Sequence, residues 1–357
     1  MFYYLIKHFI GDSTFSAITV RSLLTLLTSF MIVIILTPSI IRRMRRRNLS
    51  QPIRECGPKT HLESKKGTPS MGGIGINIAV MLSCLFWSNL NKMVLALFII
   101  YIPLAILGLS DDLMKFFHGS SAGVKARTKL LFQIAISLIF VNYIMRAGIL
   151  NPTLYIPVLG RELMLGWLYF PFVVLVITGS ANAVNLTDGL DGLAMGCSSI
   201  VALSYGIVAY LTGNAIYSNY LEVPHIKLAG ELLIPACAIL GAGFGFLWYN
   251  SYPAQIFMGD TGSLPLGGAI GGLAVLVKGE LLLVLIGGIF VLEAVSVIIQ
   301  VTSFRLRKKK VFLMTPLHHH FELSGIAEPK IVFRFWMITA ILVMMGFCII
   351  GLNILGL

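Results

Sequence analysis

The chain has 357 residues, of which 57% are hydrophobic and only 12% are charged, and its mean hydropathy is +0.88. A soluble domain carries about twice that share of charged residues, so the composition excludes an ordinary soluble fold. The formal net charge of +12 would suggest nucleic-acid binding in a soluble protein. Here the basic residues gather between apolar runs, which indicates membrane topology and no nucleic-acid partner.

Apolar runs of about 18 residues or more recur along the chain, and each is long enough to cross a bilayer as a helix. We therefore predict an all-α polytopic membrane protein with about ten transmembrane helices, forming one integral-membrane domain over residues 1–357. The first run ends in Pro38 and a basic cluster, which is a stop-transfer pattern and not a removed signal peptide. Residues 147–166 are expected to form a short hairpin outside the bilayer. The expected spans are 18–41, 71–90, 93–110, 129–146, 167–184, 192–212, 229–248, 263–278, 281–304 and 333–355.

Lysine and arginine are unevenly distributed between the two sides of this arrangement. If the loop after the first span is cytoplasmic, 20 of the 27 basic residues lie on the cytoplasmic side and 7 on the other. Because cytoplasmic loops carry the excess of Lys and Arg, both termini are predicted to lie on the periplasmic or extracellular side.

Five of the six aspartates lie where an apolar run meets a short polar loop, all on the predicted cytoplasmic face. Carboxylates at membrane depth are expensive and usually functional. These aspartates are Asp111, Asp112, Asp188, Asp191 and Asp260. Carboxylate oxygens hold Mg²⁺, which also bridges to substrate phosphates, and the nearby Lys115 and Lys129 could neutralise phosphate oxygens. The alternative is an ordinary loop with solvated charges at a helix end.

Two further loops carry dense polar sequences. Asn185, Asp188 and Asp191 belong to a segment with two Asp-Gly dipeptides, typical of tight turns where the backbone approaches a ligand. A capped hairpin turn is the alternative, but the polar groups outnumber what capping needs. The second loop runs from Asn250 to Ser263, and its aromatic residue Phe257 could stack on a base or pack at the membrane interface.

Three consecutive histidines, His318, His319 and His320, do not predict a zinc site, since three adjacent residues on a regular element cannot all face one metal. Contacts to phosphate or sugar fit better. Glu293 lies inside the ninth expected span, so we expect a functional or partnering role for it. The nearby pair Gly287 and Gly288 could let that span bend.

Several segments, in this order along the chain, resemble the phospho-N-acetylmuramoyl-pentapeptide transferases, a branch of the polyprenyl-phosphate hexose-1-phosphate transferase superfamily. The aspartate motifs are shared by the superfamily, whereas the triple histidine and the Gly-Thr-Pro-x-Met-Gly-Gly pattern are more specific to the branch. Ser70 stands where the family usually has Thr, and both residues carry a hydroxyl. The segments are 67–73, 111–112, 185–192, 257–263 and 316–322.

The resemblance implies ten transmembrane helices with both ends outside the cytoplasm, in agreement with the charge distribution. It implies a homodimer in the bacterial cytoplasmic (inner) membrane, with the active site on the cytoplasmic face and a lipid groove beside a bent ninth span. The implied reaction transfers phospho-MurNAc-pentapeptide from UDP-MurNAc-pentapeptide to undecaprenyl phosphate. UMP leaves, and Mg²⁺ is required.

The resemblance also implies residue roles. Asp260 matches the family's metal-ligand aspartate, Asp112 is expected to help hold the metal, and Asp111 is the candidate base. A two-step route with a covalent aspartyl intermediate stays open. His318 is placed with the catalytic residues. Phe257 is expected to stack on uracil. The expected substrate-binding residues are Lys65, Ser70, Lys115, Lys129, Asn185, Asp188, Asp191, Asn250, Phe257, His319 and His320.

Two alternative functions fit parts of the same sequence. The nearer one is transfer of GlcNAc-1-phosphate to the same lipid, against which the triple histidine argues. The other is a membrane transporter, because ten spans with an intramembrane Glu293 could bind a coupling ion. Against transport, the polar groups gather at one membrane face and no inverted repeat is visible.

Overall fold

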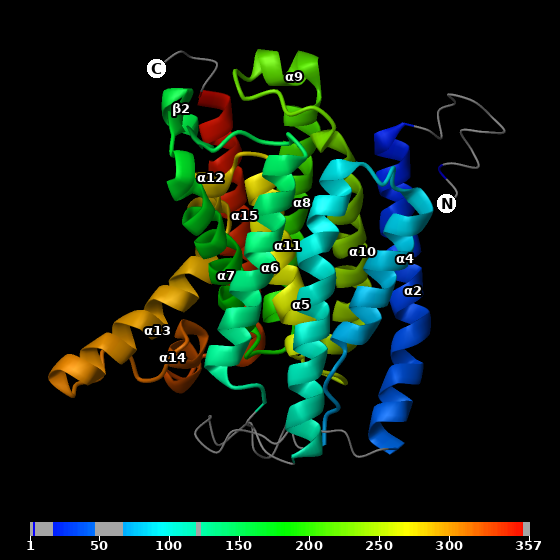
Figure 1. The fold of residues 1–357 in the computed structure, drawn as a ribbon. Helices are drawn as coiled ribbons and strands as arrows, with labels where there is room; N and C mark the ends of the chain where they lie inside the picture. Colours follow the sequence, from blue (N-terminus) through cyan, green and yellow to red (C-terminus); the bar gives the residue numbers. More distant parts are fainter. Residues whose placement is uncertain (1–2, 4–16, 47–66, 119–122, 353–357) are drawn as a thin grey trace.

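The computed structural model describes residue 3 and residues 17–46, 67–118 and 123–352, which form a bundle of long helices with a small hairpin at one end (Figure 1). The first half of the described chain contains α2 (Ile18–Arg46), α4 (Gly73–Trp87), α5 (Lys92–Phe117), α6 (Ala126–Arg146), β1 (Thr153–Ile156), η2 (Pro157–Leu159), β2 (Arg161–Met164), η3 (Gly166–Leu168) and α7 (Tyr169–Thr187). The second half contains α8 (Leu193–Gly213), α9 (Ala215–Tyr220), η4 (Ala229–Leu232), α10 (Leu233–Asn250), α11 (Asp260–Leu276), α12 (Glu280–Ile286), α13 (Gly288–Arg307), α14 (Leu317–Leu323) and α15 (Glu328–Leu352).

The outside of the bundle is apolar, as a lipid environment requires. On α2 the side chains of Leu23, Leu27 and Met31 are all more than half exposed, and their spacing places them on one face of the helix. Eight helical segments of the described chain are long and apolar enough to cross a membrane. The structure therefore confirms a mostly helical, multi-pass membrane protein.

Two of the ten predicted spans do not reach that length. The predicted span 71–90 is occupied by α4, an apolar helix of 15 residues, and the predicted span 263–278 by α11, with 17 residues. The total of ten spans therefore stays a prediction.

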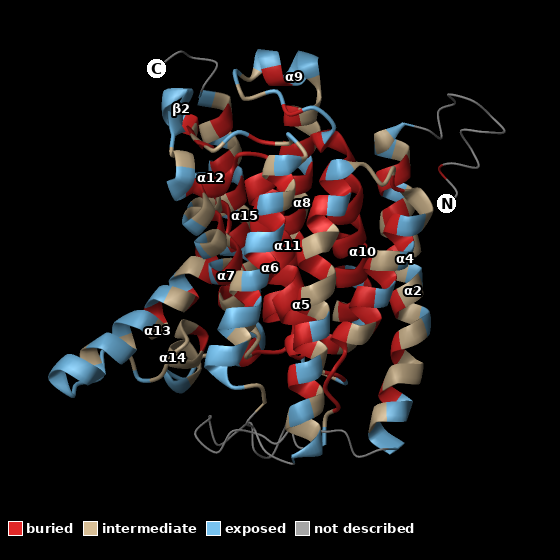
Figure 2. Cartoon of the chain, in the orientation of Figure 1, coloured by how far each residue is buried: buried red, intermediate tan, exposed pale blue. Residues whose placement is uncertain are grey.

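Helix α11 is the centre of the bundle, and all of its residues are buried (Figure 2). Its glycines let neighbouring helices approach closely. A Cβ at Gly267 would lie 2.5 Å from the carbonyl oxygen of Ser180 in α7, and one at Gly268 would lie 2.2 Å from the Leu104 side chain in α5. Small residues at helix contacts allow this close packing within a bilayer. Helices α5 and α7 are thereby held against α11, whose first residue is Asp260.

The predicted bend of the ninth span is a complete break. Helix α12 ends at Ile286 and α13 begins at Gly288, with Gly287 between them. From this point α13 leans away from the bundle and its second half is mostly exposed, with α14 beside it (Figures 1 and 2). The expectation that the two glycines interrupt the helix is confirmed.

The expected hairpin is also present, as strands β1 and β2. They pair antiparallel, with Thr153 opposite Met164 and Ile156 opposite Arg161. The start of α2 and the end of α15 lie at this same end of the bundle, which we call the hairpin end (Figure 1). Asp111 lies toward the opposite end, near the close of α5. Which end faces the cytoplasm stays a prediction.

Candidate active site

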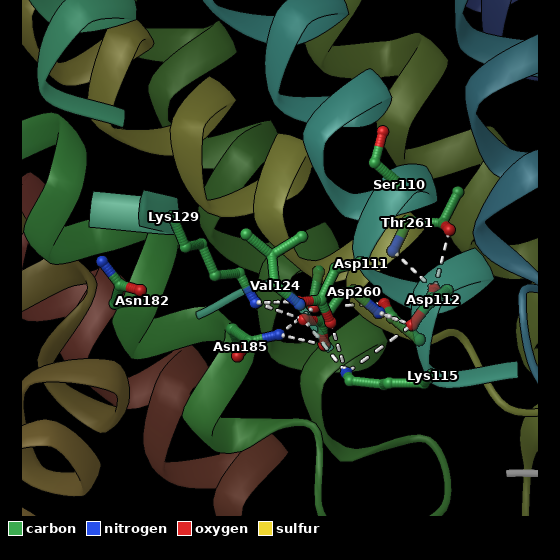
Figure 3. A network of polar contacts seen from close by, with 12 residues as sticks. Ser110, Asp111, Asp112, Lys115, Val124, Lys129, Asn182, Asn185, Asp260 and Thr261 are labelled. Carbon is green, nitrogen blue, oxygen red and sulfur yellow. Dashed lines mark hydrogen bonds and ion pairs between the residues drawn. The ribbon is translucent and has the colours of Figure 1, made fainter. Parts of the chain in front are cut away.

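Three carboxylates from two helices meet at one point. Asp111 and Asp112 lie in the last two turns of α5, and Asp260 is the first residue of α11. One oxygen from each lies within 4.8 Å of the other two. The three residues are between 2% and 9% exposed, and their side chains lie together in Figure 3. We call Asp111, Asp112 and Asp260 the carboxylate cluster.

Two glycines make this approach possible. A Cβ at Gly108, one turn before Asp112, would lie only 2.1 Å from the carbonyl oxygen of Asp260. Gly259 precedes α11 with φ +75°, a backbone conformation that favours glycine, and a Cβ there would lie 2.5 Å from Asp112 Oδ2. Any larger residue would therefore push the two helix ends apart.

Asp112 caps α11 from the neighbouring helix. Its Oδ2 accepts hydrogen bonds from the backbone N–H of Thr261 at 2.9 Å and from the Thr261 hydroxyl at 2.7 Å. Its Oδ1 accepts from the backbone N–H of Asp260 at 3.2 Å. The first N–H groups of a helix lack partners within the helix, and a carboxylate there also complements the helix dipole. Asp112 thus fixes the position of Asp260 as well as contributing a charge.

Two lysines bridge the carboxylates. Lys115 Nζ lies 2.6 Å from Asp111 Oδ2, 3.3 Å from Asp260 Oδ2 and 3.8 Å from Asp112 Oδ1. Lys129, from the first turn of α6, forms an ion pair with Asp260 and lies 3.6 Å from Asp111 Oδ1. Both ammonium groups are part-buried, and in Figure 3 they approach the carboxylates from different sides.

Helix α7 adds an amide to the cluster. The Asn185 side chain donates to Asp260 Oδ1 at 2.9 Å and to the Ser263 hydroxyl at 2.8 Å. On the other side, the backbone N–H of Val124 donates to Asp111 Oδ1 at 2.9 Å. The carboxylates are thus oriented by α5, α6, α7, α11 and the segment before α6.

The donor set fits a divalent cation. With all three carboxylates ionised, the two bridging ammonium groups leave one negative charge in excess. Hard carboxylate oxygens are what Mg²⁺ binds, usually one or two of them together with waters and substrate phosphates. The buried hydroxyl of Ser70 lies beside Gly259 and has no hydrogen-bond partner within the described residues. A polar ligand entering here would satisfy it.

The two polar loops next to the cluster are tied to each other. Asn250 accepts from the backbone N–H of Gly192 at 3.0 Å and donates to the carbonyl of Ile256 at 2.8 Å. Asp191 Oδ2 accepts from the backbone N–H of Ala254 at 2.9 Å. Both side chains are therefore used to hold loop against loop.

Asp188 follows the last residue of α7 and is half-buried, so its side chain remains within reach of solvent. Phe257 is joined through its backbone to the start of α4. Its N–H donates to Pro69 at 2.8 Å, and its carbonyl accepts from Gly72 at 2.9 Å. This pairing brings Ser70 to the cluster. Lys65 lies outside the described residues.

His318 is oriented by the intramembrane carboxylate. Glu293 accepts from the backbone N–H of Leu317 at 2.6 Å and of His318 at 3.2 Å, and it also lies 3.2 Å from His318 Nδ1. The other ring nitrogen, Nε2, packs on Gly189, where a Cβ would lie 2.2 Å away. His318 is fully buried and connects α13 to the loop that carries Asp188.

The other two histidines have different neighbours. His319 Nδ1 lies 3.0 Å from Glu322 Oε2, and His320 Nδ1 accepts from the backbone N–H of Leu313 at 3.2 Å. The His318 and His319 rings lie against each other, with centroids 4.3 Å apart, whereas the His320 ring packs against Phe312.

Sequence reasoning did not assign a role to several residues that shape the site. Thr261 and Ser263 lie within the family-like segment 257–263, but their bonds to Asp112 and Asn185 depend on contacts between distant segments. Glu328, which accepts from the backbone N–H of Asp191 at 2.7 Å, belongs to no motif. No spacing in the sequence could have indicated it.

Comparisons with known proteins identify a family of transferases. Residues 93–278 match the model of the family described as glycosyl transferase family 4. The chain is 45% identical to the phospho-N-acetylmuramoyl-pentapeptide-transferases of Citrifermentans bemidjiense and of Geobacter sp. (strain M21), over 97% of this chain and 98% of each relative. It is 44% identical to the protein of the same name from Pelobacter propionicus, with the same coverage.

Proposed function

The chain belongs to the phospho-N-acetylmuramoyl-pentapeptide transferases, and we propose that it makes lipid I in peptidoglycan biosynthesis. In this reaction phospho-MurNAc-pentapeptide passes from UDP-MurNAc-pentapeptide to undecaprenyl phosphate, and UMP is released. The observation that carries the site assignment is the carboxylate cluster, with three buried carboxylates and two bridging lysines at one end of the bundle.

The chemistry is a phosphoryl transfer. An oxygen of the lipid phosphate forms a bond to the β-phosphorus of the nucleotide sugar, and the bond from that phosphorus to the UMP oxygen breaks. Such transfers depend mainly on positioning and on neutralising phosphate charge. Asp111 accepts the proton of the attacking phosphate. Lys115 and Lys129, held beside it, face the phosphate oxygens.

Asp112 and Asp260 are the residues that would hold Mg²⁺. The bound ion would supply positive charge to stabilise the departing UMP phosphate. Asn185 acts on the same site by holding Asp260, and the unpartnered hydroxyl of Ser70 is placed to bind a phosphate or metal-bound water.

The remaining residues serve the nucleotide and sugar. Phe257 and Asp188 lie in the two loops next to the cluster, which suits recognition of the uridine, while Asp191 and Asn250 keep those loops together. His318, which Glu293 orients, packs against the loop that carries Asp188. We assign Lys65, His319 and His320 to binding of phosphate or sugar.

We place the carboxylate cluster on the cytoplasmic face of the bacterial inner membrane. The support is the excess of basic residues that the sequence places on that side, together with the start of α2 and the end of α15 at the hairpin end (Figure 1). Ten membrane spans and a homodimer belong to the same proposal.

The test is UMP release by the full-length detergent-solubilised protein with undecaprenyl phosphate and Mg²⁺, using UDP-MurNAc-pentapeptide and UDP-GlcNAc side by side. We expect release from the first substrate only, and its loss on adding EDTA. Release from UDP-GlcNAc alone would move the protein to the related sugar branch. Release from neither, by folded protein, would refute the proposal and favour transport.

A further inference from the structure

A second polar pocket lies at the hairpin end of the bundle, away from the carboxylate cluster. It is a cavity of about 490 Å³, a size within the usual range for small-ligand sites. Its walls come from the starts of α5 and β1, β2, the segment after α6, the loop before η4 and the residues after α11. We call it the hairpin-end pocket.

Three lysines from separate parts of the chain converge on this pocket: Lys92, Lys227 and Lys278. Only seven of the 27 basic residues belong to this end of the molecule by the topology of the sequence, so three of those seven share one cavity. The positive-inside rule depletes basic residues on this side of the membrane. Three lysines in one cavity are therefore not expected if each lysine only extends into water at the end of a helix.

The three lysines are not equivalent. Lys278 is only 4% exposed and donates to the carbonyl of Asn151 at 2.6 Å and to the Thr153 hydroxyl at 2.9 Å, so its ammonium holds the hairpin in place. The Lys278 ammonium is therefore already engaged by oxygens of the protein.

Lys92 and Lys227 remain available for a ligand. Both are exposed; Lys92 makes one long hydrogen bond, 3.3 Å to the carbonyl of Ala147, and the structure gives Lys227 no hydrogen bond or ion pair among the described residues. The acidic residue of the pocket, Glu162, already accepts from the Thr153 hydroxyl at 2.6 Å. With the three lysines and Glu162 ionised, the lining carries two positive charges in excess.

The pocket is also partly apolar. Met93 and Ile226 line it as buried side chains, and Leu228 is about half exposed at its edge. A cavity with two available ammonium groups and an apolar wall, at the end of a membrane-spanning bundle, suits an amphiphilic anion better than a neutral ligand. Lysine side chains also bind phosphate as compact charges.

We propose that the hairpin-end pocket is a second ligand site, which binds a phosphate-bearing anion through Lys92 and Lys227. The phosphate can come from the headgroup of an anionic phospholipid or from free phosphate. The site is separate from the carboxylate cluster, because Lys92 and Asp111 are 19 residues apart on α5, which corresponds to about 28 Å along the helix.

The experiment titrates the full-length detergent-solubilised protein with short-chain phosphatidylglycerol, short-chain phosphatidylcholine or inorganic phosphate, and follows the thermal unfolding midpoint. A ligand that binds only the folded protein raises this midpoint in a saturable way. We expect phosphatidylglycerol to do so and Lys227→Gln to raise its Kd about fivefold, equivalent to about 1 kcal/mol. The matched control Arg161→Gln removes one charge at the same end, outside the pocket, and should leave the Kd unchanged.

The other arms identify the source of the phosphate. A response to phosphatidylglycerol but not to inorganic phosphate assigns the pocket to a lipid headgroup, whereas a Lys227-dependent response to both assigns it to phosphate of either source. Phosphate bound at the carboxylate cluster would not respond to Lys227→Gln. The proposal is overturned if no probe binds saturably, or if the Lys92→Gln, Lys227→Gln double variant binds as well as the wild type. Neither result bears on the transferase assignment.

Discussion

Replacing Gly108 by Ala should disable the active site by separating two helices. The added Cβ would lie 2.1 Å from the carbonyl oxygen and 2.5 Å from the carbonyl carbon of Asp260, whereas ordinary contacts begin at 3.4 Å. The difference requires α5 and α11 to separate by about 1.3 Å at this point. Both contacting atoms belong to backbone, so no side-chain rotation can relieve the clash.

This displacement would move Asp111 and Asp112 relative to Asp260. Misplacing a catalytic group by about 1 Å can cost about 100-fold in rate, and overpacking a helix contact typically costs about 1–3 kcal/mol of stability. We therefore expect kcat for UMP release to fall about 100-fold in Gly108→Ala. The assay is UMP release at saturating substrates, together with the thermal unfolding midpoint of the same preparation.

Two controls separate geometry from general destabilisation. Gly268→Ala is equally crowded, but by the flexible Leu104 side chain, and it lies eight residues or about 12 Å along α11 from Asp260. It should lower stability with a much smaller loss of kcat. Gly179→Ala meets no atom within 4 Å and should be nearly neutral. If Gly108→Ala is as active as Gly179→Ala, the reasoning about the cluster is wrong.

Further predictions concern single side chains. Asp111→Asn removes the proposed base and should lower turnover about 100-fold or more with little change in stability; a loss confined to KM would contradict this role. Asp112→Asn should lower turnover and also destabilise the protein by about 1–2 kcal/mol, because both carboxylate oxygens accept hydrogen bonds from α11 whereas an amide keeps only one acceptor oxygen; equal melting of the two variants would refute the capping role. Glu293→Gln should lower activity about tenfold through His318, so adding it to His318→Asn should cause little extra loss. Full additivity in that double-mutant cycle would mean that the two residues act independently.

Much of the fold is encoded in local sequence patterns. Every predicted span overlaps a helix of the described chain. The interruption at Gly287 follows from two adjacent glycines in an apolar run. The hairpin likewise follows from turn residues between β-forming segments. The length of α4 and the full burial of α11 did not follow, because they depend on which helices pack around them. Hydropathy records that a segment is apolar and not whether lipid or protein covers it.

The candidate active site could likewise be predicted only in part from the sequence. Burial cost and motif composition identified the aspartates, and the structure brings Asp111, Asp112 and Asp260 together. The hydrogen bonds by which Asp112 caps α11 and Asn185 holds Asp260 join residues 148 and 75 positions apart. Such contacts leave no periodicity in one sequence, so the distinction between residues that react and residues that position them required the structure.

The most direct measurement of the central claim is the rate of lipid I formation by Asp260→Asn in the full-length protein. Glu222→Gln, the same carboxylate-to-amide change at an exposed position of the hairpin end, is the matched control. If the carboxylate cluster performs the transfer, Asp260→Asn remains folded and loses at least about 100-fold in rate, while Glu222→Gln keeps the wild-type rate. Near wild-type turnover by folded Asp260→Asn would contradict the account.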